Sequence, residues 1–137
     1  MTTVAPSPRP QAARAAARLT TAAGWSIIAI AALHTAVFVP QAPWSEWFHG
    51  GLRTADPDYE SVSLFWALPG SMVIPGLLLG ALMIRIGRRD QRLGIGYPIV
   101  LFAWAASCVW LIGPSGFMTF LVPVGLLIAA AVADRKH

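Results

Sequence analysis

Charged side chains are scarce in this sequence: Asp, Glu, Lys and Arg make up 12% of its 137 residues, about half the fraction typical of a soluble domain. Hydrophobic residues make up 56% and are spread along the whole chain. This distribution excludes a separate water-soluble domain, and a length below about 150 residues indicates one domain. We therefore predict that the protein lies in a lipid bilayer.

The sequence also lacks the motifs of most enzymes and cofactor-binding proteins. A single cysteine, Cys108, excludes an internal disulfide. There is no P-loop, dinucleotide-binding fingerprint or haem-attachment motif, and no pair of ligands has the spacing of a zinc site. A serine hydrolase would have to combine Ser63 or Ser107 with His34 and Glu46, but neither serine lies in a nucleophile elbow. We predict no cofactor and no metal.

Four apolar runs contain no Asp, Glu, Lys or Arg, and each approaches the roughly 17 to 25 residues that a membrane-spanning helix needs. Water cannot satisfy backbone groups inside the bilayer, so we expect each run to be helical. The predicted fold is all-α: a bundle of four transmembrane helices over residues 19–137, preceded by a disordered basic tail over residues 1–18. The spans are predicted at about 22–40, 62–84, 93–112 and 117–133.

The N-terminal tail has two parts with different expectations. Prolines at positions 6, 8 and 10 favour an extended chain, whereas the alanine-rich run 11–19 can continue the first span as a short helix. A signal peptide would also place arginines before an apolar run, but no small-residue cleavage site follows in the sequence FVPQAPWSEW. We therefore expect the first apolar run to be a membrane span.

The basic residues alternate along the chain in a pattern typical of membrane topology. They precede the first span, fill the connection between the second and third spans, and follow the fourth span. The first connection instead carries one arginine, Arg53, and four acidic residues. By the positive-inside rule, both termini and the second connection lie in the cytoplasm. We assign the net charge of +4 to topology and to contact with membrane lipid, not to nucleic acid, and predict a multi-pass protein of the plasma (cytoplasmic) membrane.

The second span and the last connection carry distinctive residues. Pro69 and Pro75 lie inside the second predicted span, and because proline removes a backbone hydrogen bond we expect this helix to be bent. Gly76 and Gly80 form a small face against which another helix can pack closely. The third and fourth spans are joined only by the sequence GPSG, residues 113–116, so we predict that they are antiparallel neighbours.

His34 is the only histidine within the predicted spans. A polar group in hydrocarbon needs a partner, so its side chain should face other helices. Two interpretations stay open: a packed histidine bonded to a serine hydroxyl or to a backbone carbonyl freed by a proline, or a ligand-contacting or proton-transferring group in an outward-facing pocket. Aromatic side chains concentrate in the same outer half, where those of the first connection also fit a belt or a lid. The candidate ligand-binding residues are His34, Trp44, Glu46, Trp47, Phe65, Trp66, Trp104, Ser107, Trp110 and Phe117.

Several short motifs resemble a family of small bacterial four-helix integral membrane proteins classed as a domain of unknown function. The motifs are Trp25 and Ser26 followed by His34, the pair Phe65 and Trp66, and GPSGF at 113–117 leading into LVPVGLLI. The resemblance covers roughly residues 24–133 and implies the four-span architecture. The long basic tail and the acidic first connection depart from the family, and the resemblance implies no activity.

Three functions are compatible with these residues. The first, which the sequence favours, is a non-enzymatic membrane module that holds a hydrophobic small molecule or lipid, such as a quinone or terpenoid, among the aromatic side chains. The second is an accessory subunit of a larger membrane complex, or a homo-oligomer, with a membrane protein as its partner. The third is a membrane-embedded enzyme of the isomerase or cyclase type, with His34 as acid or base on a lipid-like substrate.

Overall fold

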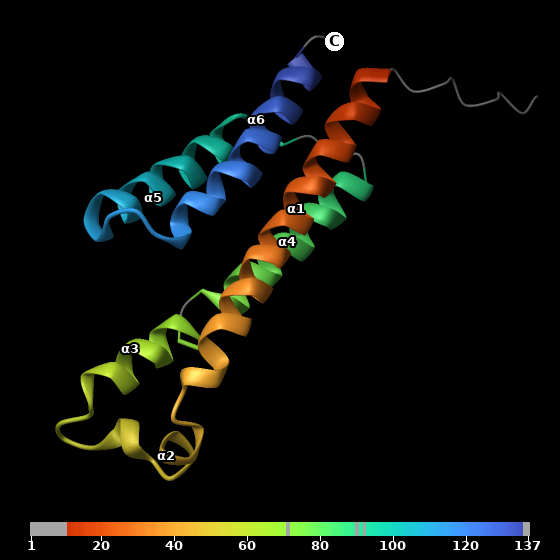
Figure 1. Ribbon diagram of the computed structural model, residues 1–137. Helices are drawn as coiled ribbons and strands as arrows, with labels where there is room; N and C mark the ends of the chain where they lie inside the picture. Colours follow the sequence, from red (N-terminus) through yellow and green to blue (C-terminus); the bar gives the residue numbers. More distant parts are fainter. Residues whose placement is uncertain (1–10, 71, 90, 92, 136–137) are drawn as a thin grey trace, which may run out of the picture.

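A computed structural model describes residues 11–70, 72–89, 91 and 93–135 of the chain. Within these residues the regular structure is helical and includes no β-strand, so the predicted all-α class is confirmed. Figure 1 shows four long helices: α1 (Gln11–Phe38), α4 (Val73–Arg88), α5 (Gly96–Ile112) and α6 (Leu121–Arg135). The shorter elements are α2 (Trp44–Phe48), α3 (Tyr59–Ala67) and the 3₁₀ turns η1 (Val39–Gln41), η2 (Gly51–Arg53) and η3 (Gly116–Phe120).

The first helix begins earlier than the apolar run. α1 starts at Gln11 and includes most of the predicted tail, because its alanine-rich sequence has a high helix propensity. Residues 11–18 are therefore helical, in agreement with the expected extension of the first span and not with a disordered tail that reaches residue 18. Residues 1–10 lie outside the described part of the chain.

The predicted second span, 62–84, is two helices and not one bent helix, which corrects that part of the prediction. α3 ends at Ala67, and the next residue, Leu68, leaves the helical region with φ −105° and ψ −99°. The cause is Pro69, because the ring of a proline disfavours the helical conformation in the residue before it. Pro75 lies in the first turn of α4, where a helix has no use for the missing N–H group.

The end of α3 is closed by a glycine. The backbone N–H of Gly70 donates to the carbonyl oxygen of Phe65 over 2.8 Å. A Cβ atom on Gly70 would lie 2.9 Å from that same oxygen and 2.9 Å from the Trp66 ring, closer than ordinary van der Waals contact. A side chain at residue 70 would therefore collide with the last turn of α3.

α1 and α4 are antiparallel and pack through their backbones (Figure 1). A Cβ atom on Gly24 would lie 2.6 Å from the Gly80 carbonyl oxygen, and one on Gly80 would lie 2.8 Å from the Gly24 carbonyl oxygen. Gly76 continues this face, at 3.5 Å from the Ala31 Cβ by the same measure. The small-residue face predicted from Gly76 and Gly80 thus packs within the chain, against α1.

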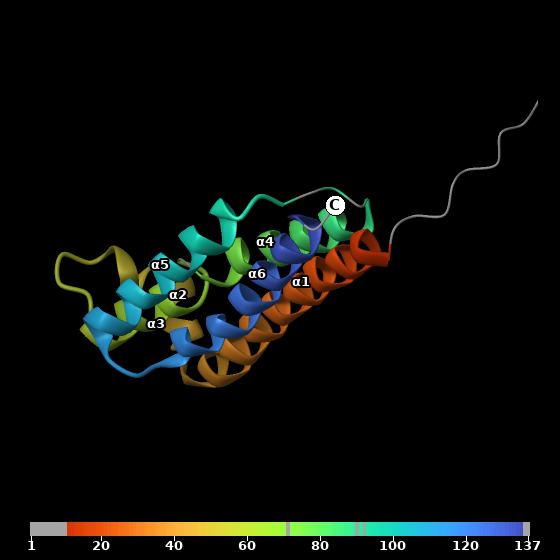
Figure 2. The ribbon, with the colours of Figure 1, turned by 90° about the horizontal axis from the view of Figure 1, so that it is seen from above.

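The four long helices form an open row and not a closed bundle. α1 packs against α4 on one side and α6 on the other, and α6 in turn packs against α5 (Figures 1 and 2). The tight 113–116 turn makes α5 and α6 antiparallel neighbours, as predicted. In the described residues no extensive packing joins α4 to α5, which are the two ends of the row. The buried centre, where α1, α4 and α6 meet, consists of Ala23, Ile27, Met83 and Leu127.

Both described ends of the chain lie on the same side of the molecule, at one end of the long helices along their axes. The start of α1 and the end of α6 are near the α4–α5 connection, whereas α2 and α3 lie at the opposite end (Figure 1). By length and composition, two segments could cross a membrane: Gln11–Gln41 and Gly116–Asp134. α5 is as apolar but shorter, with 17 residues.

Candidate functional site

Four of the predicted site residues form a connected aromatic group, called here the loop cluster: Trp44, Trp47, Phe65 and Trp66. The ring centroids of Trp44 and Trp47 are 5.1 Å apart, those of Trp47 and Phe65 are 6.0 Å apart, and those of Phe65 and Trp66 are 5.6 Å apart. All three pairs are edge-to-face, a geometry that contributes about 0.5–1.5 kcal/mol per pair beyond burial. The loop cluster therefore fixes α2 against α3.

Hydrogen bonds within the connection use the polar atoms of the loop cluster. Asp58 caps α3 by accepting from the backbone N–H of Ser61 over 2.9 Å. The buried hydroxyl of Ser61 accepts from Trp47 Nε1 over 2.7 Å, and Trp44 Nε1 donates to the Val39 carbonyl over 2.9 Å. Because both indole N–H groups of α2 are used inside the loop, these tryptophans anchor it and offer no free donor to a ligand.

His34 joins α1 to the break between α3 and α4. Its Nε2 lies 2.8 Å from the Ala67 carbonyl oxygen. An oxygen of this kind can only accept, so Nε2 carries the proton. The carbonyl is free because the helix stops before Pro69, so this geometry is the one expected for a packed histidine bonded to a carbonyl freed by a proline. The ring also contacts Phe38, at a centroid distance of 4.6 Å.

Glu46 does not reach His34, and no hydrogen bond or ion pair joins these two described residues. The Glu46 side chain is exposed and folds over Gly51 in its own loop: a Cβ atom on Gly51 would lie 2.7 Å from Glu46 Oε1. The carboxylate therefore faces solvent at the loop surface, outside the loop cluster.

The remaining predicted residues divide between a second aromatic group and the outer surface. Trp104 packs edge-to-face on Phe117 and on the buried Phe120, at centroid distances of 5.3 and 5.1 Å. Ser107 is exposed and donates its hydroxyl to the carbonyl one turn earlier, while Trp110 is 88% exposed. The structure thus does not bring the ten predicted residues into one pocket.

A cleft of about 670 Å³ opens between α4 and α5, at the two ends of the helix row. This volume falls within the roughly 300–1,000 Å³ usual for small-molecule sites. None of the described residues that line the cleft is charged, and Gly94 and Gly96 leave open space at one end. The other lining residues are Leu79 and Met83 of α4, Tyr97, Val100, Leu101 and Trp104 of α5, and Leu127 of α6.

The surface of this cleft is almost wholly apolar, although two of the residues that line it carry hydrogen-bond donors. The Tyr97 hydroxyl and the Trp104 Nε1 have no hydrogen-bond partner among the described residues. They are seven residues apart on α5, which separates them by about 10 Å along the helix axis. Sequence reasoning selected only Trp104, although the spacing of Tyr97, Val100, Leu101 and Trp104, at i, i+3, i+4 and i+7, is that of one helix face.

No family model, curated protein or solved structure matches this chain. The resemblance to small four-helix membrane proteins therefore stays a prediction. The loop cluster, the bond of His34 and the α4–α5 cleft are the features from which a function can be argued.

Proposed function

We propose that this protein is embedded in a membrane. Large apolar side chains are exposed on the outer faces of all four long helices, whereas soluble monomers rarely expose apolar patches above a few hundred Å². In the two segments long enough to cross a membrane, only 22% and 33% of the residues in the most apolar 18-residue stretch are buried. The core helices of a soluble protein would be mostly buried. Lipid would cover these faces, which include Leu33 on α1, Leu78 on α4, Leu111 on α5 and Val122 on α6.

We infer four crossings with both termini in the cytoplasm. α4 and α5 have 16 and 17 residues, a length of about 24–26 Å, slightly less than the roughly 30 Å of a hydrocarbon core. α3 extends the second crossing beyond the break, and residues 93–95 extend the third. Both described chain ends lie near the C-terminal end of α4, which carries Arg85, Arg88 and Arg89. The positive-inside rule assigns this side of the molecule to the cytoplasm.

Within the membrane, the function that the geometry supports best is the binding of a hydrophobic small molecule or lipid chain in the α4–α5 cleft. The observation that carries this proposal is the cleft itself, which is about 670 Å³ in volume and has no charged residue in its described lining. The almost wholly apolar lining suits the hydrocarbon part of a quinone, a terpenoid or a lipid chain.

The loop cluster supports such a function less well than the cleft. Its indole donors bond within the loop, and the Nε2 of His34 is bonded to a backbone carbonyl. These bonds favour structural roles for Trp44, Trp47 and His34. Catalysis by His34 and a role as an accessory subunit stay predictions from the sequence.

The test is mass spectrometry of small molecules retained after extraction of the protein in native lipid particles. We expect one apolar compound to co-purify with the protein, and the Val100→Trp variant, which fills the cleft, to lower its occupancy at least about fivefold. Ile99→Trp is the matched control, because Ile99 is 55% exposed and does not line the cleft. Equal losses in the two variants, or no retained compound in the wild-type protein, would contradict the proposal.

A further inference from the structure

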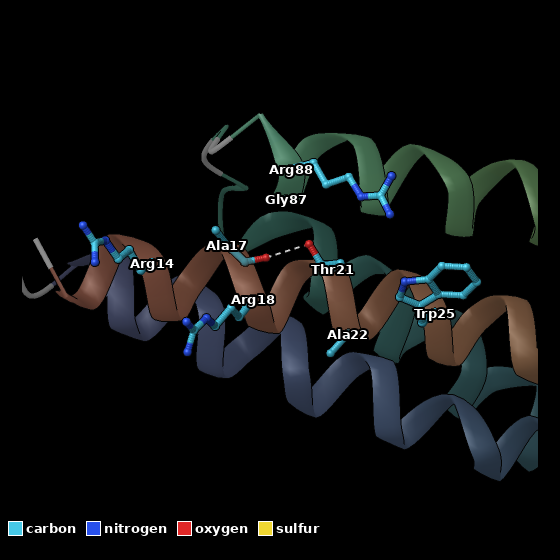
Figure 3. Close-up of a pocket in the computed structure, with 8 residues that line it drawn as sticks. All are labelled: Arg14, Ala17, Arg18, Thr21, Ala22, Trp25, Gly87 and Arg88. Atoms are coloured by element: carbon cyan, nitrogen blue, oxygen red, sulfur yellow. Dashed lines mark hydrogen bonds between the residues drawn. The ribbon is translucent and has the colours of Figure 1, made fainter. Parts of the chain in front are cut away.

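A second site lies on the side of the molecule where α1 begins and α4 ends, which is also the side that carries the arginines. A groove of about 490 Å³ runs between the N-terminal half of α1 and the C-terminal end of α4. Figure 3 shows Arg14 and Arg18 on successive turns of α1 and Arg88 on α4, with the Trp25 ring further along the groove. Three arginines from two helices therefore line one groove, together with an indole ring, and their guanidinium groups point in different directions in Figure 3.

The free polar side-chain groups of this groove are all hydrogen-bond donors. Guanidinium groups and indole N–H groups donate and do not accept. The one hydroxyl, that of Thr21, donates to the Ala17 carbonyl over 2.9 Å, as the dashed line in Figure 3 marks. Among the described residues no acidic side chain lines the groove, and none forms an ion pair with Arg14, Arg18 or Arg88. Such a lining attracts an anion with several acceptor oxygens.

Close packing of α1 on α4 brings the three arginines to the same groove. A Cβ atom on Gly87 would collide with the Thr21 hydroxyl and lie 2.8 Å from the Ala17 carbonyl oxygen. The C-terminal end of α4 is therefore held directly against α1, and the residue that follows Gly87 is Arg88. Because Gly87 is buried, the position of Arg88 relative to α1 is set by backbone contact and not by side chains alone.

We propose that this groove binds a phosphate group, carried by an anionic phospholipid or by a soluble compound. Guanidinium groups recognise phosphate through charge-assisted hydrogen bonds, and a single guanidinium group can contact two phosphate oxygens. The lipid source rests on the proposed membrane embedding. It fits the order of residues along α1, since Arg14 and Arg18 precede the apolar run and Trp25, 54% exposed, lies within it. A headgroup would lie beside the arginines, with the indole at the boundary between the headgroup layer and the hydrocarbon core.

The test is native mass spectrometry of the full chain in neutral detergent, titrated with dioleoylphosphatidylglycerol or dioleoylphosphatidylcholine, together with calorimetry using inorganic phosphate. We expect phosphatidylglycerol to bind more tightly than phosphatidylcholine, and Arg88→Gln to weaken its binding at least about fivefold. Arg89→Gln is the matched control, because it removes the same charge from the same helix end but does not line the groove. We expect it to change binding less than about twofold.

Each outcome of this experiment has a separate meaning. Selective loss of phosphatidylglycerol binding in Arg88→Gln supports a lipid phosphate, and loss of inorganic phosphate binding in the same variant, without a lipid preference, supports a soluble one. Equal effects of Arg88→Gln and Arg89→Gln would show only diffuse surface charge and would overturn the proposal, as would the absence of binding by all three probes. The Val100→Trp result concerns the other side of α4, so the two proposals can fail independently.

Discussion

The contact between α1 and α4 makes a sharp prediction for Gly24→Ala. The new Cβ atom would lie 2.6 Å from the Gly80 carbonyl oxygen, whereas ordinary contact begins at 3.4 Å, so the helices must separate by 0.8 Å (3.4 − 2.6) at this point. A gap of this size forfeits roughly a quarter to a half of each dispersion contact around it, and overpacking of this kind typically costs about 1–3 kcal/mol. The gain in helix propensity from glycine to alanine, about 1 kcal/mol, offsets only part of this cost. We expect a net loss of up to about 2 kcal/mol of unfolding free energy.

The matched control is Gly125→Ala in α6. A Cβ atom there meets nothing within 4 Å, so this variant should gain about 0.5–1 kcal/mol from propensity alone. The two changes are chemically identical and should shift stability in opposite directions. The assay is equilibrium unfolding in mixed micelles with increasing SDS, followed by far-ultraviolet circular dichroism. If Gly24→Ala is as stable as Gly125→Ala, the direct backbone contact of α1 with α4 does not exist.

Two further predictions concern the chain breaks. His34→Phe should lower the unfolding free energy by about 1 kcal/mol and speed hydrogen exchange in the last turn of α3, because the Ala67 carbonyl loses its donor. His34→Gln can place an amide N–H near the same oxygen, so it should retain most of the stability. Equal losses of unfolding free energy in both variants would refute the role of this bond. Gly113→Ala should cost about 1–3 kcal/mol in the same assay, because Gly113 has φ 89° and ψ −173°, a region almost restricted to glycine. Gly116→Ala in the same turn has open space and no positive φ, and a similar loss there would contradict the explanation.

Much of the helical structure could be predicted from local sequence, but the role of each proline could not. Pro69 and Pro75 look alike within one apolar run, yet the first ends α3 and the second lies in the first turn of α4. A proline is tolerated within the first turn of a helix and disruptive after it. The outcome for Pro75 therefore depended on where α4 begins, which Pro69 and Gly70 decide upstream.

The sequence indicated which aromatic residues to consider, but not which of them pack together. α5 is apolar on every side, so periodicity gave no indication of which face is covered. Trp104 and Trp110 are both aromatic residues of α5, yet Trp104 packs on Phe117 and Trp110 is exposed. The cleft also depends on the order of the helices in the row, which is a non-local property. Only the packing of α1 between α4 and α6 leaves α4 and α5 apart.

The open row has a mechanical consequence for the cleft. α5 and α6 are tied together by the 113–116 turn, and it is chiefly through α6 that this hairpin contacts the rest of the protein. A small rotation of the hairpin about the α1–α6 contact would widen or narrow the space beside α4 without disturbing the glycine contacts of α1. The contact between α1 and α6 would be the axis of such a rotation, because it holds most of the packing between the hairpin and the rest of the protein.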